Sequence, residues 1–261
     1  MCRRENAFIG SLSLAVMILF LQVFVARLEA TSFSWDTMDY QHQKHVFIIA
    51  SGRSGSTSIL WMLNQIPGYD LKGETNGKLG HQIYQTYTVF TEEHAAIEKT
   101  LSDAFIHSNK MDHHLLKHAL GELFMAFENF NKNATTVGYK ELAERLGPNM
   151  TIAELYLDIF PNAKFVLNFR ENATAQLQSQ FWKKRDVGYF EKITSSLKSF
   201  NQRHPKQTFV LLKEEITAQK FNELFEWLGE PCNCSEILRL NDAGGYTDQS
   251  IVPKVVHCHH P

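Results

Sequence analysis

A short polar segment that follows an apolar run has the residue types needed to bind an anion. The run HVFIIA covers residues 45–50, and the polar segment SGRSGSTS covers residues 51–58. Successive backbone N–H groups at a strand-to-helix turn form a concave anion site, to which the helix N-terminus adds partial positive charge. Glycine lets the backbone approach the anion closely, and arginine adds a fixed charge with several donors. The residues that we expect to bind the anion are Gly52, Arg53, Ser54, Gly55, Ser56, Thr57 and Ser58.

This segment has two competing interpretations. An ordinary turn between a strand and a helix also uses glycine and serine, but it does not need so many donors. The phosphate loop of nucleotide kinases reads G-x-x-x-x-G-K-[ST]. The segment lacks both that spacing and the lysine, so the pattern argues against an ATPase or a kinase.

Residues 53–57, RSGST, resemble the loop that holds the 5′-phosphosulfate group in sulfotransferases that use 3′-phosphoadenosine 5′-phosphosulfate (PAPS). That loop has the form [KR]-S-G-[ST]-[ST] after a strand. The chain resembles the membrane-associated, Golgi-type members, and its motifs are also similar to those of tyrosyl-protein and bacterial trehalose-type sulfotransferases. The resemblance implies sulfuryl transfer from PAPS to an acceptor hydroxyl by in-line displacement, with no metal ion. Arg53 would then stabilise charge on the bridging oxygen.

The resemblance also implies a second phosphate site. In the family, an arginine at the end of a strand and a serine on the next helix bind the 3′-phosphate of the donor. Here Arg170 follows the apolar run 164–169, and Ser179 stands nine positions after Arg170. The usual form has the serine one position earlier, where this chain has Gln178. A trehalose-type form has a glutamine three positions before the serine, which Gln176 and Ser179 fit.

Sulfuryl transfer requires a base, because the acceptor hydroxyl loses its proton as it attacks sulfur. Residues 73–76, GETN, resemble the G-E-E or P-E-E element whose glutamate is the base in tyrosyl-protein and bacterial sulfotransferases. The resemblance therefore implies that Glu74 is the general base. Glu141, which ends the segment GYKE, is the alternative. Many cytosolic members use histidine, and the histidines considered for that role are His81, His107, His113, His114 and His118.

The order of apolar segments predicts the elements that position these residues. Strands are expected over 45–50, 136–140, 164–169 and 208–213, and helices over 55–65, 92–109, 112–130, 152–160, 173–184 and 218–228. Strands that alternate with helices indicate a parallel sheet covered on both faces. Together with the resemblance, this predicts a three-layer α/β, P-loop-like sulfotransferase fold with a central parallel sheet of about five strands. Ligands of such sheets bind at the carboxyl ends of the strands.

The N-terminus has the features of a targeting segment. Arg3 and Arg4 precede an uncharged stretch over 7–26, which is long enough to span a bilayer as a helix. It is either the retained signal anchor of a single-pass type II membrane protein or a signal peptide cleaved after Ala30. Both place the rest of the chain in the secretory pathway, at the Golgi membrane if anchored or secreted if cleaved. The expected parts are an N-terminal hydrophobic helix (1–30), a short stem (31–44) and one lumenal sulfotransferase domain (45–261).

The cysteines fit an oxidising compartment. The chain contains Cys2, Cys232, Cys234 and Cys258. Either Cys232 or Cys234 can form a disulfide bond with Cys258 in the lumen. A metal site that uses these cysteines with His259 and His260 is the alternative, but the spacing matches no common zinc pattern. The sequons that could carry glycans in a lumenal protein are at Asn133, Asn149, Asn172 and Asn233.

The composition restricts the classes of function. Apolar residues make up 44% of the 261 residues, enough for the core of one α/β domain, and the formal net charge is −2. A general nucleic-acid binder would carry a clear basic excess. We expect the partners to be a glycan, glycoconjugate or protein acceptor, and a membrane through the N-terminal helix. A carbohydrate or glycoconjugate acceptor is favoured by the resemblance. The alternatives are a catalytically inactive nucleotide-binding member of the same fold and a tyrosyl-protein sulfotransferase.

Overall fold

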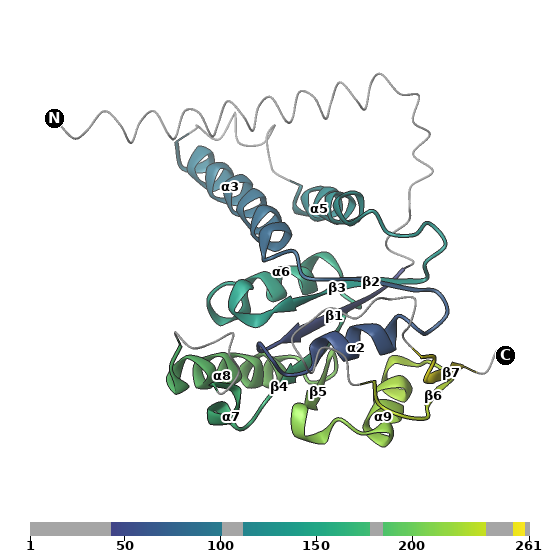
Figure 1. The fold of residues 1–261 in the computed structure, drawn as a ribbon. Helices are drawn as coiled ribbons and strands as arrows, with labels where there is room; N and C mark the ends of the chain where they lie inside the picture. Colours follow the sequence, from purple (N-terminus) through teal and green to yellow (C-terminus); the bar gives the residue numbers. More distant parts are fainter. Residues whose placement is uncertain (1–42, 101–111, 178–184, 239–252, 259–261) are drawn as a thin grey trace. The chain divides into compact units, whose positions relative to one another are not determined.

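A five-stranded parallel sheet forms the centre of the fold (Figure 1). The strand order is β2-β3-β1-β4-β5, so β1 is the middle strand and helical crossovers connect the strands. The strands are β1 (Lys44–Ala50), β2 (Tyr69–Lys72), β3 (Thr136–Leu142), β4 (Lys164–Phe169) and β5 (Thr208–Leu212). The predicted α/β fold with a central parallel sheet is therefore confirmed.

The computed structural model describes residues 43–100, 112–177, 185–238 and 253–258. The expected N-terminal helix (1–30) and most of the expected stem (31–44) lie outside these ranges. Within the described ranges, no helix combines the length and the apolar composition needed to cross a bilayer.

One face of the sheet is covered by α2 (Ser56–Leu63) and α9 (Ala218–Leu228). Their apolar side chains share one buried cluster with Val46 and Ile48 of β1 and with Val166 of β4. Val46 and Ile48 are two positions apart and therefore point to the same side of their strand. Burial of this apolar surface holds the two helices on the sheet.

The opposite face is built around aromatic side chains. The ring of Phe47 on β1 stacks on Tyr156 at a centroid distance of 5.0 Å and meets Phe124 edge-on at 5.8 Å. Phe165 on β4 packs against Phe200 at 5.2 Å. The helices on this face are α5 (His113–Glu128), α6 (Thr151–Ile159) and α8 (Val187–Arg203). With helices on both faces, the domain has the three layers that were predicted.

Some elements differ from the sequence-based prediction. Strand β2 and helix α8 were not predicted, and neither were β6 (Cys232–Cys234) and β7 (Val256–Cys258), which form an antiparallel pair. Helix α3 (Lys78–Thr100) begins well before the predicted start at residue 92. The prediction missed its first half because that half has no continuous apolar stripe. Helix α7 (Ala173–Leu177) is the described part of the helix predicted over 173–184.

The parallel sheet brings the segments that hold the candidate residues to one edge. Because parallel strands point the same way, every segment that directly follows a strand leaves from the carboxyl edge of the sheet. These segments are residues 51–55 after β1, residues 73–77 after β2, η1 (Ala143–Arg145) after β3, Arg170 after β4 and η4 (Lys213–Glu215) after β5. The candidate residues thus lie at the edge where ligands of such sheets bind.

Candidate active site

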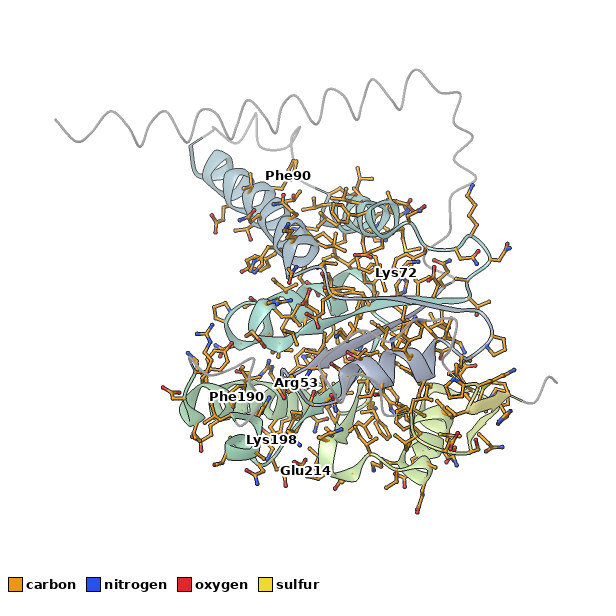
Figure 2. All side chains as sticks on the ribbon, viewed as in Figure 1. Arg53, Lys72, Phe90, Phe190, Lys198 and Glu214 are labelled. Carbon is orange, nitrogen blue, oxygen red and sulfur yellow. A yellow bond between two sulfur atoms is a disulfide. The ribbon has the colours of Figure 1, made fainter. Side chains whose placement is uncertain are left out.

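The segment between β1 and α2 is a tight turn that begins a helix. Gly55 directly precedes α2 with a φ of 91°, and Arg53 has a φ of 62°. Both angles lie in the left-handed region, which suits glycine but costs energy for arginine. The Ser51 N–H donates to the carbonyl oxygen of Asn168 at 2.9 Å, which joins the turn to β4. Figure 2 shows Arg53 beside the start of α2.

The Ser54 hydroxyl is bonded within the protein. Ser54 is buried, and its hydroxyl oxygen lies 2.7 Å from the carbonyl oxygen of Ser51 and within hydrogen-bond distance of Asn168 Oδ1. The amide of Asn168 in turn donates to the Leu211 carbonyl on β5 at 2.8 Å. These bonds connect the turn to β4 and β5, so the Ser54 side chain fixes the loop. As a ligand of an anion, Ser54 stays a prediction, through its backbone N–H.

The other predicted loop residues lie at or next to the N-terminus of α2. Gly52, Ser56 and Ser58 are buried, whereas Thr57 is half-buried. The Ser58 N–H donates to the Gly55 carbonyl at 3.0 Å and closes the first turn. The helix therefore starts with its positive end at the loop, as an anion site of this type requires.

Gln176 on α7 is a fully buried polar residue that contacts the loop. Its Nε2 donates to Ser51 Oγ at 3.1 Å and to the carbonyl oxygen of Gly52. This contact fixes α7 against the loop between β1 and α2. The link between Gln176 and the trehalose-type pattern stays a prediction, because Ser179 lies outside the described residues.

Arg170 lies at the carboxyl end of β4, next to β1. Its Nη1 donates to the Ala175 carbonyl at 3.3 Å, and its Nε lies 4.0 Å from Glu214 Oε1. The Arg170 side chain is 25% exposed, but its Nε is buried. Ser179 and its alternative Gln178 lie outside the described residues.

Glu74 is held by two cations. Its Oε1 pairs with Lys140 Nζ of β3 at 2.5 Å, and its Oε2 pairs with Arg145 Nη1 of η1 at 3.0 Å. The Glu74 side chain is 27% exposed, whereas that of Lys140 is 7% exposed. Glu74 is thus a carboxylate in a fixed position that solvent or a ligand can still reach.

Glu141, the alternative base, is completely enclosed, with a side-chain exposure of 0%. Its Oε2 accepts from Gly77 N at 2.8 Å, from Thr75 Oγ1 at 3.0 Å and from Thr75 N at 3.2 Å. Its Oε1 accepts from Leu142 N at 2.9 Å and from Arg145 Nη1 at 3.2 Å. The two candidate bases therefore differ in access, and only Glu74 is accessible.

The histidines considered as bases lie on α3 and α5. His81 is exposed in the first turn of α3, where its N–H donates to the Gly77 carbonyl at 2.9 Å. His113 and His114 are exposed at the start of α5, and His118 is half-buried one turn later. His107 lies outside the described residues. Of these histidines, His81 is the one whose backbone bonds to the loop of Glu74.

Three residues of this edge were missed by the sequence analysis. Lys213 of η4 lies against the turn, because a Cβ atom placed on Gly55 would be 3.2 Å from Lys213 Nζ. Arg145 joins the two glutamates described above. Burial raises the pKa of Glu144, its neighbour in η1. Lys213 could have been predicted as a site residue because it directly follows the apolar run of β5. The local sequence around Arg145 gives no such signal.

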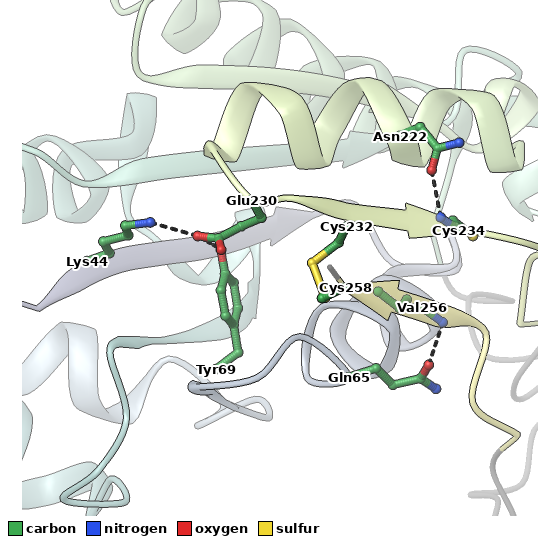
Figure 3. Close-up of a disulfide and its surroundings, with 9 residues drawn as sticks. All are labelled: Lys44, Gln65, Tyr69, Asn222, Glu230, Cys232, Cys234, Val256 and Cys258. Atoms are coloured by element: carbon green, nitrogen blue, oxygen red, sulfur yellow. Dashed lines mark hydrogen bonds and ion pairs between the residues drawn. A yellow bond between two sulfur atoms is a disulfide. The ribbon is translucent and has the colours of Figure 1, made fainter. Parts of the chain in front are cut away.

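The disulfide is between Cys232 and Cys258, which decides between the two pairings that the sequence left open (Figure 3). Cys234 is a buried free thiol. A metal site made of these cysteines would need thiolates that the disulfide removes. No group of three or more His, Cys, Asp or Glu side chains in the described ranges is placed to hold a metal ion, and His259 and His260 lie outside them.

Comparison with known proteins identifies one family. A family model described as the sulfotransferase family matches residues 45–223. Similar solved structures include the sulfotransferase STF9 from Mycobacterium avium, with 12% identity, a TM-score of 0.42, and coverage of 82% of this chain and 68% of that one. A sugar kinase from Janibacter sp. HTCC2649 has 15% identity, a TM-score of 0.36 and coverages of 72% and 95%. Thymidylate kinase from Candida albicans has 14% identity and a TM-score of 0.40, and the match covers 72% of this chain and 93% of that one. No curated protein matches the chain.

Proposed function

Because this chain belongs to the sulfotransferase family, we propose that it transfers a sulfuryl group from PAPS to the hydroxyl group of a carbohydrate or glycoconjugate. The acceptor oxygen forms a bond to sulfur as the bond between sulfur and the bridging oxygen of the 5′-phosphate breaks. The acceptor proton goes to Glu74, and adenosine 3′,5′-bisphosphate leaves. The reaction class follows from the family, whereas the donor, acceptor and base are parts of the proposal.

The observation that carries the proposal is the loop between β1 and α2. Positive φ angles at Arg53 (62°) and Gly55 (91°) create a tight turn at a helix N-terminus, and a turn of this kind can bind a phosphate. In this proposal the backbone of residues 52–58 binds the 5′-phosphosulfate. Arg53 neutralises the charge that develops on the leaving phosphate. The amine of Lys213, beside Gly55, adds a second positive charge at the same turn.

The proposed 3′-phosphate site includes Arg170. Strands β4 and β1 are neighbours in the sheet, so the two phosphate sites would lie at the ends of adjacent strands. A guanidinium can bind a phosphate through two parallel hydrogen bonds. We propose that a 3′-phosphate takes the place of the contact between Arg170 and Glu214, whose closest atoms are 4.0 Å apart. Ser179 completes this site in the proposal.

Glu74 is the proposed base because of its access and its position. It follows β2, which is separated from β1 by the single strand β3. Neighbouring strands are about 4.8 Å apart, so β1 and β2 lie roughly 10 Å apart, which leaves room for the sulfuryl group and an acceptor hydroxyl. Glu141 cannot meet an acceptor in this arrangement, since its side chain is 0% exposed and five donor contacts surround it.

The proposed location is the secretory pathway, with residues 1–30 as the membrane anchor and residues 45–261 as the lumenal domain. The disulfide between Cys232 and Cys258 supports this location, because such bonds persist in oxidising compartments. A lumenal location in turn supports a glycan or glycoconjugate acceptor, or a tyrosine on a secreted protein.

The direct test is transfer of labelled sulfate from PAPS by the purified full chain to a panel of glycans, glycolipids and tyrosine peptides. We expect labelled product from at least one carbohydrate acceptor, at a rate that falls on the order of 10²- to 10⁴-fold when Glu74→Gln replaces the wild-type protein. Transfer to tyrosine peptides alone would replace the carbohydrate part of the proposal. Binding of the bisphosphate without transfer to any acceptor would instead favour the inactive member, a candidate suggested by the internal bonds of Arg170.

A further inference from the structure

Glu141 is a buried carboxylate at the end of β3 that no step of the proposed reaction uses. A carboxylate with 0% exposure is costly to bury unless hydrogen bonds and opposite charge replace the lost water. Here both oxygens have such partners: Oε2 accepts from the backbone of Thr75 and Gly77, and Oε1 accepts from Leu142 N and Arg145. The sequence therefore keeps a charge in an interior position, and the partners show what that charge organises.

The partners of Glu141 belong to the loop of Glu74 or contact its carboxylate. Two of them, the N–H groups of Thr75 and Gly77, belong to the loop that carries Glu74, and bonds of 3.2 and 2.8 Å fix its course. A third partner is Arg145, whose Nη1 lies 3.2 Å from Glu141 Oε1 and 3.0 Å from Glu74 Oε2. One guanidinium nitrogen thus connects the enclosed carboxylate to the accessible one.

We propose that Glu141 is a positioning residue that sets the orientation of Glu74 for proton transfer. It fixes the backbone beside Glu74 and also Arg145, one of the two cations that hold the Glu74 carboxylate. This inference rests on the proposed function, because it assigns Glu141 a role through the proposed base. A misplacement of about 1 Å of a catalytic group can lower a rate on the order of 10²-fold, so the loss of this anchor should appear in kcat.

The most informative variant is Glu141→Gln. Glutamine has the same shape, but one of its two terminal atoms is an NH2 donor. In one orientation that NH2 faces the N–H groups of Thr75 and Gly77. In the other it faces the N–H group of Leu142 and the guanidinium of Arg145. The variant therefore breaks one half of the network while leaving the volume unchanged. A matched control is Glu223→Gln on α9, which removes a charge paired with Lys220 on the surface.

The experiment measures kcat, the KM for PAPS and the pH dependence of kcat for the wild-type chain, Glu141→Gln, Glu74→Gln and Glu223→Gln. We expect Glu141→Gln to lower kcat on the order of 10²-fold and to leave the KM for PAPS within about twofold. The acid limb of the pH profile should remain in Glu141→Gln and disappear in Glu74→Gln, because the base itself is still present in the first variant. Glu223→Gln should behave like the wild-type chain.

A second pair of variants covers the case in which Glu141→Gln does not fold. Thr75→Val removes only the hydroxyl that lies 3.0 Å from Glu141 Oε2, and it should lower kcat on the order of threefold to tenfold. Thr75→Ser keeps that hydroxyl and should recover most of the loss.

The outcomes separate the two claims. A wild-type kcat in both Glu141→Gln and Thr75→Val would overturn the inference. If Glu74→Gln still lowers transfer in that case, the proposed function remains intact. Loss of the acid limb in Glu141→Gln, with the limb retained in Glu74→Gln, would make Glu141 the base and overturn the inference. A wild-type chain that transfers no sulfate from PAPS would overturn the proposed function together with this inference.

Discussion

Arg53 combines a charged side chain with a backbone conformation that is unusual for it. Its φ of 62° costs a residue with a Cβ atom roughly 1–2 kcal/mol, and the rest of the turn must offset that cost. A purely structural loop would be expected to place glycine at this position. The proposed function offers a reason for an arginine there, because in that proposal its side chain serves the ligand.

Arg53→Ala tests this role while preserving the backbone requirement, because alanine also has a Cβ atom. We expect sulfate transfer to fall on the order of 10²- to 10³-fold, as the charge on the leaving phosphate loses its partner. The thermal midpoint should change little. The measurement is the initial rate at saturating PAPS, with Arg203→Ala as the control, since Arg203 pairs with Glu154 on the surface. Equal rates in both variants would rule out a catalytic role for Arg53.

His45 on β1 links stability to pH. Its ring stacks on Phe160 at a centroid distance of 4.1 Å, and burial lowers its pKa from 6.5 to about 4. Between these values the unfolded chain binds a proton that the folded chain does not, so stability decreases as pH falls below 6.5. The loss reaches about 3 kcal/mol near pH 4 and is absent above pH 7.

Urea unfolding of the wild-type chain and His45→Gln across this pH range measures that contribution. The free energy of unfolding of His45→Gln should depend less on pH between 6.5 and 4 than that of the wild-type chain. An exposed-histidine variant, His114→Gln, should keep the wild-type dependence. Identical slopes for the wild-type chain and His45→Gln would contradict the assignment.

Sequence reasoning could name candidate residues for the site, but it could not predict their contacts or their exposure. The loop residues and both glutamates were predicted, but one segment cannot show whether a carboxylate is accessible. The choice between Glu74 and Glu141 depends on Thr75 and Gly77, which lie more than sixty positions from Glu141 in the sequence, and on Arg145, four positions after it. The same holds for Ser54, whose hydroxyl is directed to Asn168, more than a hundred positions away in the sequence.

Gly138 shows how closely β3 approaches β1. Its φ is 152°, and a Cβ atom at this position would lie 1.9 Å from the Val46 carbonyl oxygen. Gly138→Ala should therefore destabilise the protein by at least ~3 kcal/mol, because two central strands would have to separate. Gly229→Ala is the control, since Gly229 also has a positive φ (79°) but no atom within 4 Å of the added carbon. Chemical denaturation measures the free energy of unfolding of both variants. An equal decrease in the two would contradict this description of β3.

The disulfide anchors β7 to β6 after α9. It closes a loop with a sequence separation of 26, which corresponds to about 3.5 kcal/mol of stabilisation in the chain-entropy model. We expect Cys258→Ser to lower the thermal midpoint and Cys234→Ser to retain the disulfide. Peptide mapping without reduction should find Cys232 joined to Cys258, whereas a Cys234–Cys258 peptide would contradict the assignment.

The elements that could be predicted are those with a continuous apolar run or a clear stop signal. Strands β1 and β4 are buried on both faces and have such runs. Strand β2 alternates apolar and polar residues at the edge of the sheet, over only four residues. Helix α8 places Phe190, Ile193, Leu197 and Phe200 on one buried face, and Asp186 caps it, so its pattern was present in the sequence but was overlooked.

In the whole chain, the candidate site lies along one edge of one sheet. Strand order places β1 in the centre, with the loop of Glu74 on one side and Arg170 on the other. The family establishes the class of reaction. The donor, however, is a proposal that rests on two phosphate sites, and a ligand with phosphates at both the 3′ and 5′ positions should fit both.

The most direct test is therefore calorimetric titration of the purified full chain with adenosine 3′,5′-bisphosphate and, separately, with ATP. We expect a dissociation constant for the bisphosphate on the order of 10 μM, at least tenfold weaker binding of ATP, and loss of bisphosphate binding in the double variant Arg53→Ala/Arg170→Ala. Tight binding of ATP with no binding of the bisphosphate would contradict the proposed donor.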